Sequence, residues 1–346
     1  RPRHQDRTMS IAILHADPRI GLLDNWQRDF PLCQRPYANL GRSFDLSEAE
    51  VISVLSECQE DGRLSRVGAV IKPNSVGAST LAAMAVPEER MEEVADLVNA
   101  EPGVNHNYER EHDLNLWFVV TAPDAAALAA TLERIARTTG FKVVDLPLEC
   151  AYHIDLGFPL DGRGNARRGA GSAPHRAEPD EDDRRLLAEI EDGLPLAPRP
   201  YAEIALRLGW KEEEVLSRLA ALHEAGIISR FGCIVRHRSL GFTANAMVAW
   251  NVPDHRVDTA GALVACHNIV SLCYRRTRRP PVWGHNLFAM IHGRERGEVK
   301  AAIESVTLAS GLAEVDRDIL FSRRCFKQRG ARYSNGRGAG GHRGAA

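Results

Sequence analysis

Two short segments of the chain combine tyrosine and arginine at a spacing that a β-strand can use. The first reads HNYER from His106, so that Tyr108 and Arg110 stand two positions apart, and Tyr274 and Arg276 have the same separation. Alternate residues of a strand point to one face, so each tyrosine should share a face with its arginine. Such a face suits a flat ligand with carboxylates, because rings stack on it and guanidinium groups bind carboxylates through two hydrogen bonds.

Histidines near these segments are candidates for proton transfer, since histidine titrates near neutral pH. His106 is the first candidate for a proton donor, with Tyr108 positioning it or sharing the role, and His285 is the counterpart candidate in the second segment. The candidate substrate-binding residues are Arg110, His267, Tyr274, Arg275, Arg276, Arg278, Arg279, Asn115, Trp283 and Asn286.

Structural roles compete with these chemical ones. His106 and His285 could serve as strand-end residues that bond the backbone, and the two tyrosines could be core side chains with satisfied hydroxyls. The run from Arg275 to Arg279 could be a solvated loop that leads into two prolines. Arg276 is the best supported of these arginines, because Arg110 is its equivalent in the first segment.

The two segments belong to an internal duplication. Residues 22–77 align without a gap with residues 164 positions later, so that the run RPYA from Arg35 recurs from Arg199. Tyr108 and Tyr274 continue this alignment after small insertions. The copies have diverged, because only the first has HNY before its arginine and only the second has an arginine-rich hairpin. Two identical sites are therefore not expected, and a composite site at the interface of a pseudo-dimer of the two halves is favoured over one active and one structural site.

Each copy has the same expected order of elements. In the second copy, Pro200 suits the first turn of a helix and Gly226 suits a helix C-terminus, which indicates a helix-turn-helix unit. A strand and a ferredoxin-like βαββαβ pattern follow, giving an α+β fold class. The elements expected in the second copy are helices over 183–191 and 212–224, strands over 227–236 and 244–252, a helix over 257–266, strands over 269–276 and 286–292, a helix over 298–310 and a last strand over 313–321.

Segments rich in glycine, arginine and proline separate these units, and their composition is typical of disorder. The expected organisation is a disordered N-terminus (1–15), a helix-turn-helix domain (16–62), a ferredoxin-like domain (63–158), a disordered linker (159–181), a second helix-turn-helix domain (182–226), a second ferredoxin-like domain (227–328) and a disordered tail (329–346).

The composition is that of a globular protein with no preference for anionic partners. The chain has 346 residues, 44% hydrophobic and 26% charged, with a formal net charge of −2. We expect a cytoplasmic protein, because it has no apolar run long enough to span a bilayer and no secretory signal. Its 7 cysteines include no CxxC pair, which argues against a disulfide framework and a structural zinc site, and no bound metal is expected.

The helix-turn-helix units do not have the sequence of DNA readers. A recognition helix needs basic or amide side chains at its start, whereas the third helices begin with Glu48 and Glu50 in the first copy and with Glu212, Glu213 and Glu214 in the second. Carboxylates there would repel phosphates, although they also suit a helix N-terminus. DNA is therefore not an expected partner.

The architecture resembles that of the Lrp/AsnC-type regulators over both copies. The HNYxR run from His106, the CYRR run from Cys273, the segment from Trp283 to Gly293 and GxISRFG from Gly226 are more specific: they resemble the siroheme decarboxylase family of heme d1 biosynthesis, in its fused NirD–NirL form. The similarity covers nearly the whole chain apart from the linker and termini.

The resemblance implies a carboxy-lyase that removes carbon dioxide from two acetate side chains of siroheme, giving 12,18-didecarboxysiroheme. No added cofactor is expected, because the conjugated macrocycle can hold the electrons and its iron enters with the substrate. Alternatives from other classes are an Lrp/AsnC-type transcription regulator and a tetrapyrrole-binding protein without catalysis. The sequence leaves open the order of the two decarboxylations, ligation of the iron by a histidine, and homo-oligomer formation.

Overall fold

The computed structural model describes residues 18–154, 157, 160 and 178–331. The segments expected to be disordered at residues 1–15, 159–181 and 329–346 lie wholly or largely outside these residues. The chain divides into two compact units, the first made of residues 1–72 and 148–322 and the second of residues 73–147 and 323–346.

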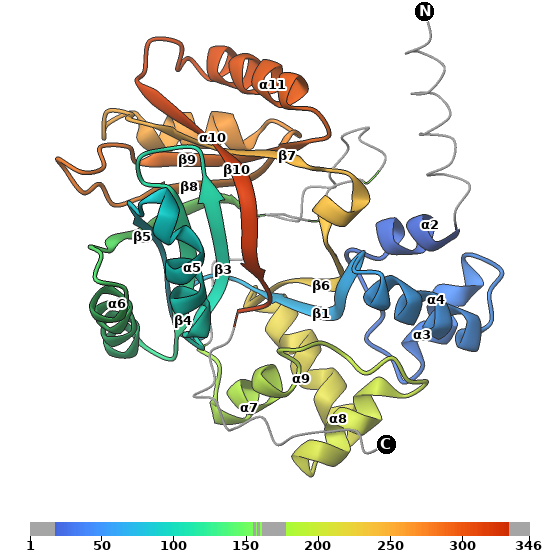
Figure 1. The fold of residues 1–346 in the computed structure, drawn as a ribbon. Helices are drawn as coiled ribbons and strands as arrows, with labels where there is room; N and C mark the ends of the chain where they lie inside the picture. The colour runs from blue at the N-terminus through green and yellow to red at the C-terminus, as the bar shows by residue number, and fades with distance from the viewer. Residues whose placement is uncertain (1–17, 155–156, 158–159, 161–177, 332–346) are drawn as a thin grey trace, which may run out of the picture. The chain divides into compact units, whose positions relative to one another are not determined.

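The first unit contains both helix-turn-helix domains, as the sequence predicts. Their helices are α2 (Pro18–Asn25), α3 (Pro36–Arg42) and α4 (Glu48–Glu60), and then α7 (Glu181–Glu189), α8 (Pro200–Leu208) and α9 (Glu212–Glu224). Pro200 opens α8, and Gly226 follows α9 with a φ of 71°, a conformation that glycine adopts without strain. A two-stranded antiparallel ribbon of β1 (Leu64–Ile71) and β6 (Ile228–Val235) joins the two domains (Figure 1).

Reciprocal contacts hold the two helix-turn-helix domains together. The Tyr37 hydroxyl donates to the Pro195 carbonyl at 2.9 Å, and the Tyr201 hydroxyl donates to the Pro31 carbonyl at 3.1 Å. Both tyrosines are fully buried. The tyrosine of each RPYA run therefore crosses to the opposite copy, which explains why the run occurs twice.

The ribbon is covered closely by the segment that follows α2. The Phe30 amide donates to the Phe231 carbonyl at 3.1 Å, and the Cys233 amide donates to the Trp26 carbonyl at 2.7 Å. A Cβ atom on Gly232 would lie 2.4 Å from the Gln27 carbonyl oxygen. Glycine is therefore required here by a close backbone approach.

The first unit also contains the ferredoxin-like sheet of the second repeat. Its elements are η2 (His237–Leu240), β7 (Ala244–Trp250), α10 (Val257–Ala265), β8 (Val270–Arg276), β9 (Leu287–Gly293), α11 (Arg296–Ala309) and the first part of β10 (Arg317–Gln328). The strand order is β5-β8-β9-β7-β10. Both helices pack on one face of this sheet through a core that includes Trp250, Val264 and Ile303 (Figure 1).

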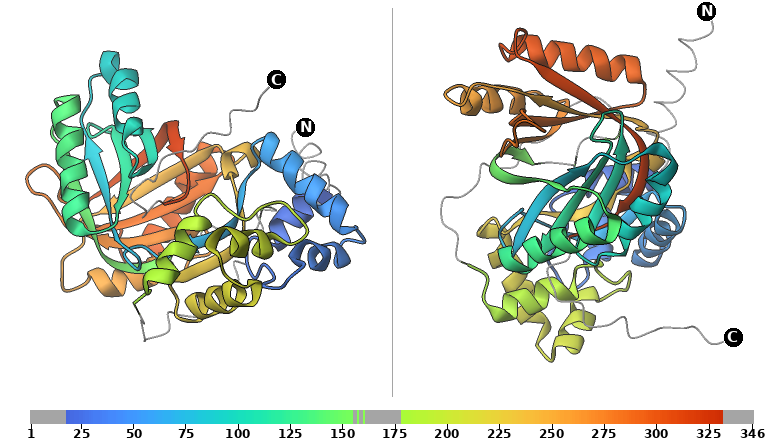
Figure 2. Two further views of the ribbon diagram at one scale, coloured as in Figure 1. Left: turned by 90° about the horizontal axis from the view of Figure 1, so that it is seen from below. Right: turned by 60° about the vertical axis from the view of Figure 1, so that its left-hand side comes forward.

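The second unit is the equivalent sheet of the first repeat. Its elements are β2 (Ala78–Met84), η1 (Glu88–Arg90), α5 (Met91–Ala100), β3 (Val104–Arg110), β4 (Leu116–Ala122), α6 (Ala125–Thr139) and the first part of β5 (Val144–Ile154). The strand order is β10-β3-β4-β2-β5. Helices α5 and α6 cover one face of the sheet (Figure 2), over a core that includes Val94, Phe118 and Ile135.

The last strand of each repeat is longer than one sheet requires. The sequence predicts the final strand over residues 313–321, but β10 begins at Arg317 and continues to Gln328. The predicted range ends at residue 321 because the run of apolar residues ends there. Residues 322–328 continue the strand with a mostly polar sequence, and they no longer lie in the sheet of their own repeat. The boundary was therefore wrong, although the element was right. Of the described helices, none is both long and apolar enough to cross a membrane.

Candidate functional site

The HNYER segment forms β3 and presents three side chains on one face. His106, Tyr108 and Arg110 alternate along the strand with residues that face the helices. The rings of His106 and Tyr108 stack with centroids 6.3 Å apart, and the Arg110 Cζ atom lies 5.5 Å from the centre of the Tyr108 ring. The Nδ1 atom of His106 lies 2.8 Å from Oδ1 of Asn105, which orients the imidazole ring. The predicted row is therefore present, on the face away from α5 and α6.

Arg110 is a buried cation. Its residue is only 6% exposed, and burial lowers the pKa of the guanidinium to about 10, with the Tyr108 hydroxyl opposing the shift. The group remains charged at neutral pH. A cation that has lost most of its hydration binds a carboxylate strongly, because both groups interact in a low local dielectric.

Asn115 and Asn286 occupy equivalent places after the two strands. Asn115 accepts from the Val86 amide at 2.9 Å and donates to the Val86 carbonyl at 2.8 Å. Asn286 makes the same two bonds to Val252, each at 3.0 Å. These bonds give both asparagines a structural role in fixing a loop, and their role in substrate binding stays a prediction.

The second repeat carries a matching row on β8. The Arg276 Cζ atom lies 5.0 Å from the centre of the Tyr274 ring. Burial raises the pKa of the Tyr274 hydroxyl well above its usual value, with the charge of Arg276 opposing the shift. The Arg276 amide donates to the Asn286 carbonyl at 2.8 Å, and the Arg110 amide donates to the Asn115 carbonyl at the same distance. The Tyr-x-Arg equivalence predicted from the duplication thus extends to the backbone.

A second group of side chains lies around His285. The ring of Trp283 is 5.0 Å from that of His285 and stacks on Phe288 at 5.8 Å. Two carboxylates flank the imidazole, since Nε2 lies 3.5 Å from Asp316 and Nδ1 lies 3.6 Å from Asp318. His285 is 8% exposed, so the two carboxylates meet the imidazole in a partly dehydrated setting.

The two aspartates were not singled out from the sequence. Asp316 and Asp318 precede and begin β10, far along the chain from His285, and their alternate spacing was the only signal that both could point to one group. Trp117 was also missed: it pairs across the sheet with Tyr108, and its Nε1 atom donates to the Leu114 carbonyl at 2.5 Å.

Other predicted residues lie in contacts that have structural roles. Arg278 forms an ion pair with Asp254 and donates from Nε to the Gly284 carbonyl at 2.8 Å, so it fixes the loop. The Arg279 backbone pairs with that of Trp283 in an isolated bridge.

Two further candidates lie on the helix side of the sheet. Nε2 of His267 is 3.5 Å from the Ser310 hydroxyl, near the ends of α10 and α11. Arg275 contacts Asp258 of α10 at 3.5 Å, away from the Tyr274 and Arg276 row. The structure therefore does not bring these two residues together with that row, and their roles in binding stay predictions.

The acidic starts of the third helices have a structural cause. Arg35 forms an ion pair with Glu48, and Arg199 forms the equivalent pair with Glu212. The Ser47 side chain accepts from the Glu50 amide while Glu50 accepts from the Ser47 amide at 2.8 Å, which is a capping box. These carboxylates stabilise the helix-turn-helix domains from within.

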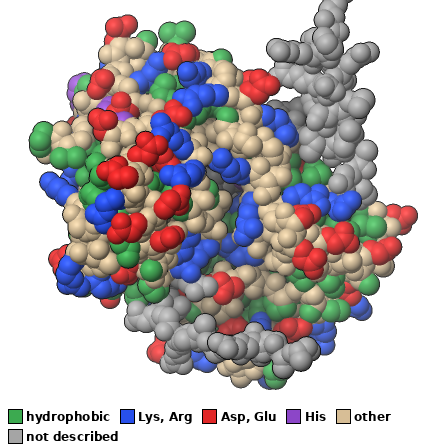
Figure 3. Space-filling view, viewed as in Figure 1, with side chains coloured by type: hydrophobic (Ala, Val, Ile, Leu, Met, Phe, Trp, Pro, Cys, Tyr) green, Lys and Arg blue, Asp and Glu red, His purple; other side chains and the backbone are tan. Residues whose placement is uncertain are grey.

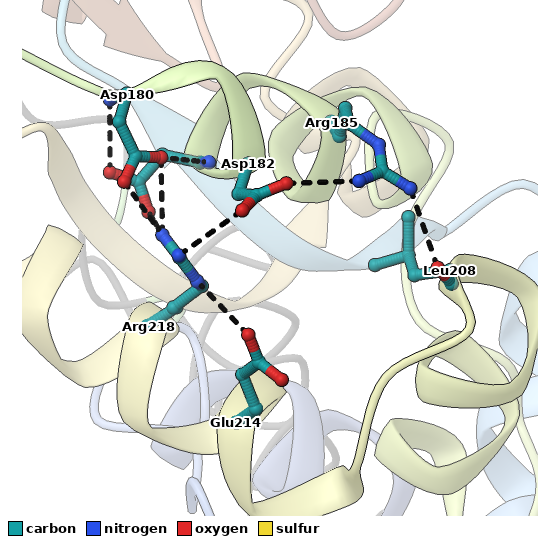
Figure 4. Close-up of polar contacts among 7 residues, drawn as sticks. Asp180, Asp182, Arg185, Leu208, Glu214 and Arg218 are labelled. Carbon is teal, nitrogen blue, oxygen red and sulfur yellow. Dashed lines mark hydrogen bonds and ion pairs between the residues drawn. The ribbon is translucent and has the colours of Figure 1, made fainter.

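The basic side chains of the second helix-turn-helix domain are also engaged with acids. Arg218 of α9 contacts Asp180, Asp183 and Glu214 at 3.1, 2.8 and 3.7 Å (Figure 4). Arg218 and Arg185 also lie on the ring of Trp210, at 5.5 and 5.3 Å. Contacts of this kind neutralise cations that a DNA reader would direct to phosphates.

The molecular surface agrees with this local charge balance. On the face drawn in Figure 3, acidic side chains stand among basic ones over α3 and α4.

Comparisons with known proteins agree with both domain types. The profile of the AsnC-like ligand binding domain matches residues 75–153 and 239–327. The profile described as the siroheme decarboxylase NirDL-like HTH domain matches residues 20–64 and 183–228. The predicted fold of two tandem Lrp/AsnC-like halves is thereby confirmed.

Relatives match nearly the whole length of the chain. The siroheme decarboxylase NirDL subunit of Paracoccus denitrificans is 48% identical and is matched over 91% of this chain and 97% of its own length. A crystal structure of the siroheme decarboxylase NirDL superposes with a TM-score of 0.66 and 30% identity, over 92% of this chain and 94% of that one. A crystal structure of NirDL in complex with an iron-uroporphyrin III analogue superposes with a TM-score of 0.65, also at 30% identity, over 91% of this chain and 94% of that one.

Proposed function

This chain belongs to the siroheme decarboxylase family, and we propose that it removes carbon dioxide from two acetate side chains of siroheme to give 12,18-didecarboxysiroheme. It is thus an enzyme of the carboxy-lyase class. The single observation in its geometry that carries the proposal is the row of His106, Tyr108 and Arg110, which joins a proton donor to a buried cation on one strand face.

The arginines of the two rows bind carboxylates of the macrocycle. Siroheme carries several acetate and propionate groups, so its binding needs more than one cation. Arg110 and Arg276 each lie against a tyrosine ring, which limits the motion of the guanidinium group and reduces the entropy lost on binding. The solved NirDL complex with an iron-uroporphyrin III analogue supports a ligand of this class.

Decarboxylation requires one proton for each carbon dioxide released. The bond between the acetate carbon and its carboxylate breaks, and the electron pair stays on that carbon, conjugated with the macrocycle. A proton from His106 then converts the carbon to a methyl group, while Tyr108 holds the imidazole by stacking. A poorly hydrated environment around the leaving carboxylate would favour loss of its charge.

His285 supplies the counterpart donor in the second repeat. Asp316 and Asp318 flank its two ring nitrogens at 3.5 and 3.6 Å, where they can orient the ring. No further cofactor is needed in this scheme, since the substrate holds the electron pair, and the iron is part of the substrate. Whether the two rows serve one composite site stays a prediction.

The function is tested by anaerobic incubation of the purified chain with siroheme, followed by mass analysis of the tetrapyrrole. We expect a product that has lost the mass of two carbon dioxide molecules, in catalytic excess over the protein. Stoichiometric binding of siroheme without loss of mass would instead identify a carrier. If a folded chain shows neither binding of siroheme nor product, both the enzyme and the carrier are excluded.

A further inference from the structure

The last strand of each repeat continues into the sheet of the opposite repeat. β5 pairs with β2 over residues 144–147 and with β8 over residues 148–154. β10 pairs with β7 over residues 317–321, and beyond them Asn99 of α5 donates to the Phe326 carbonyl at 3.4 Å. We call residues 148–154 the β5 tail and residues 323–328 the β10 tail.

The two tails occupy equivalent places. Tyr152 of the β5 tail packs on the core of the second repeat, where a Cβ atom on Gly261 of α10 would lie 2.2 Å from the tyrosine ring. Phe326 of the β10 tail packs on the core of the first repeat. Each tail therefore places one aromatic ring against the core of the opposite repeat.

The charges beside the tails differ between the repeats. The central residue of the Tyr-x-Arg motif is Glu109 in the first repeat and Arg275 in the second. The side chain of Glu109 is 7% exposed, forms an ion pair with Arg324 and lies 3.5 Å from Arg323, both of the β10 tail. Arg275 lies 2.8 Å from Glu149 of the β5 tail. The strand residue and the tail residue are thus both reversed in sign.

The adjacent helices keep the same sign in both repeats. The first turn of α5 contributes Glu92, which forms an ion pair with Arg324, and the first turn of α10 contributes Asp258, 3.5 Å from Arg275. The Thr277 hydroxyl also donates to Glu149 at 2.8 Å. The reversal of charge therefore lies in the strand residue and in the tail that meets it.

We propose that the central residue of each Tyr-x-Arg motif selects the tail that completes its sheet, so that each repeat accepts the tail of the opposite repeat and rejects that of a like repeat from a second copy of this chain. A β5 tail on the first repeat would place Glu149 beside Glu109, and a β10 tail on the second would place Arg323 beside Arg275. Like charges on neighbouring strands destabilise the pairing, and a repulsive element of this kind gives specificity. Burial of Glu109 increases the penalty, since a buried charge needs a partner of opposite sign.

The motif therefore serves two purposes on its two faces. Tyrosine and arginine point to the face proposed for the ligand, and the residue between them points to the tail. This pairing preference does not depend on the proposed reaction and is measured without it.

The test exchanges the charges of the tails in the full chain, through Glu149→Arg, Arg323→Glu and Arg324→Glu. Native pairing then becomes repulsive, and pairing between like repeats of two chains becomes attractive. We expect the mass measured by light scattering to rise to about twice the wild-type value, or amide hydrogen exchange in both tails to speed up at least about tenfold. A second variant adds Glu109→Arg, Arg275→Glu, Glu92→Lys and Asp258→Asn, the last because Asp258 would otherwise repel the new carboxylate at position 275, and it should restore the wild-type mass and the slow exchange.

A reversed ion pair outside the tails provides the control. Arg317 and Glu304 lie 2.5 Å apart, and the double variant Arg317→Glu with Glu304→Arg should keep the wild-type mass and tail exchange. Wild-type mass and exchange in the tail-exchanged variant would overturn the proposal. Failure of the restoring variant to recover them would overturn it too, even if the tail-exchanged variant does not fold.

Discussion

Arg110 and Arg276 each place a cation against a tyrosine ring at the point where the strand backbone bonds to an asparagine loop. The ring, the strand and the loop hold the guanidinium group before any ligand arrives. A side chain fixed in this way contributes to binding mainly by avoiding the entropy loss of a mobile one. The two arginines are therefore expected to affect substrate affinity more than the folding of the chain.

Replacement of Arg110 tests this expectation. Arg110→Met keeps much of the aliphatic contact with Tyr108 and removes the charge, so the dissociation constant for siroheme should rise about 10- to 100-fold, the cost of one charge-assisted pair. The measurement is a fluorescence or absorbance titration under anaerobic conditions, with Arg137→Met on the exposed surface of α6 as the control. Equal affinities in the two variants would contradict the assigned role.

His237 provides a pH-dependent contribution to stability. Burial, with the charges of His292 and Arg230, lowers its pKa from 6.5 to about 3. Between these values the unfolded chain binds a proton that the folded chain does not, so stability falls as the pH falls. The loss from this residue should be about 2 kcal/mol at pH 5.

Urea unfolding at pH 7 and pH 5 measures this contribution. The wild type should lose more stability than His237→Gln over that interval, by about 2 kcal/mol, while the variant of an exposed histidine, His255→Gln, should behave as the wild type does. An identical pH dependence for His237→Gln and the wild type would show that the buried imidazole is not the group responsible.

Site residues could be identified from the sequence when their partners lie close to them along the chain, and not when the partners are distant. Tyr108 and Arg110 could be paired by strand alternation alone, and the structure confirms their common face. Arg278 could not be separated from the ligand-binding arginines, because its partner Asp254 lies in a different loop. Asp316 was missed because its proximity to His285 arises only when the last strand joins the sheet.

Among the elements, the β1–β6 ribbon shows how close contact with a neighbouring backbone segment can require glycine at a position. Gly68 and Gly232 face each other at its centre, and the segment after α2 lies so close to Gly232 that even a Cβ atom has no room. Both glycines were visible in the sequence as part of the duplication. The reason why glycine is required at position 232 was not visible, because it depends on contact between segments some 200 positions apart.

Substitution of this glycine should destabilise the first unit. Gly232→Ala places a Cβ atom 2.4 Å from the Gln27 carbonyl oxygen, and overpacking of this kind costs about 1–3 kcal/mol. Gly297→Ala in α11 is a matched control, because no atom lies within 4 Å of its Cβ position and alanine favours a helix. Thermal unfolding of both variants compares them, and an unchanged melting temperature for Gly232→Ala would contradict the close contact.

The order of elements was predictable, whereas the extent of the last strands was not. The helix expected over 212–224 is α9 with the same bounds. The β10 tail carries the polar sequence RRCFKQ, which has no strong strand signal, and its partner strand belongs to the other repeat. Pairing across such a distance is decided by tertiary contacts and not by local pattern.

At the scale of the whole molecule, the duplicated domains have taken on different roles after divergence. The helix-turn-helix domains retain reciprocal contacts, such as those from Tyr37 and Tyr201, and their acids and bases are paired with each other. The sheets have diverged in the residues that face the ligand and the tails. We infer that the helix-turn-helix domains now hold the fold together and that the ferredoxin-like domains carry the reaction.

Duplex DNA is therefore not an expected partner. Fluorescence anisotropy with a labelled duplex at physiological salt should show only weak, sequence-independent association, because the third helices begin with carboxylates that are held in ion pairs. Tight binding that weakens steeply with salt would revive the regulator interpretation.

The most direct test of the central claim is anaerobic turnover of siroheme in deuterated water by the wild type and by His106→Ala, with His255→Ala as a control. We expect the wild type and the control to release two carbon dioxide molecules for each macrocycle and to place one deuteron on each new methyl group. His106→Ala should be at least about 100-fold slower, the usual scale for loss of a general acid. Unchanged siroheme from a folded wild-type chain would contradict the account, and full activity of His106→Ala would contradict the assignment of the proton donor.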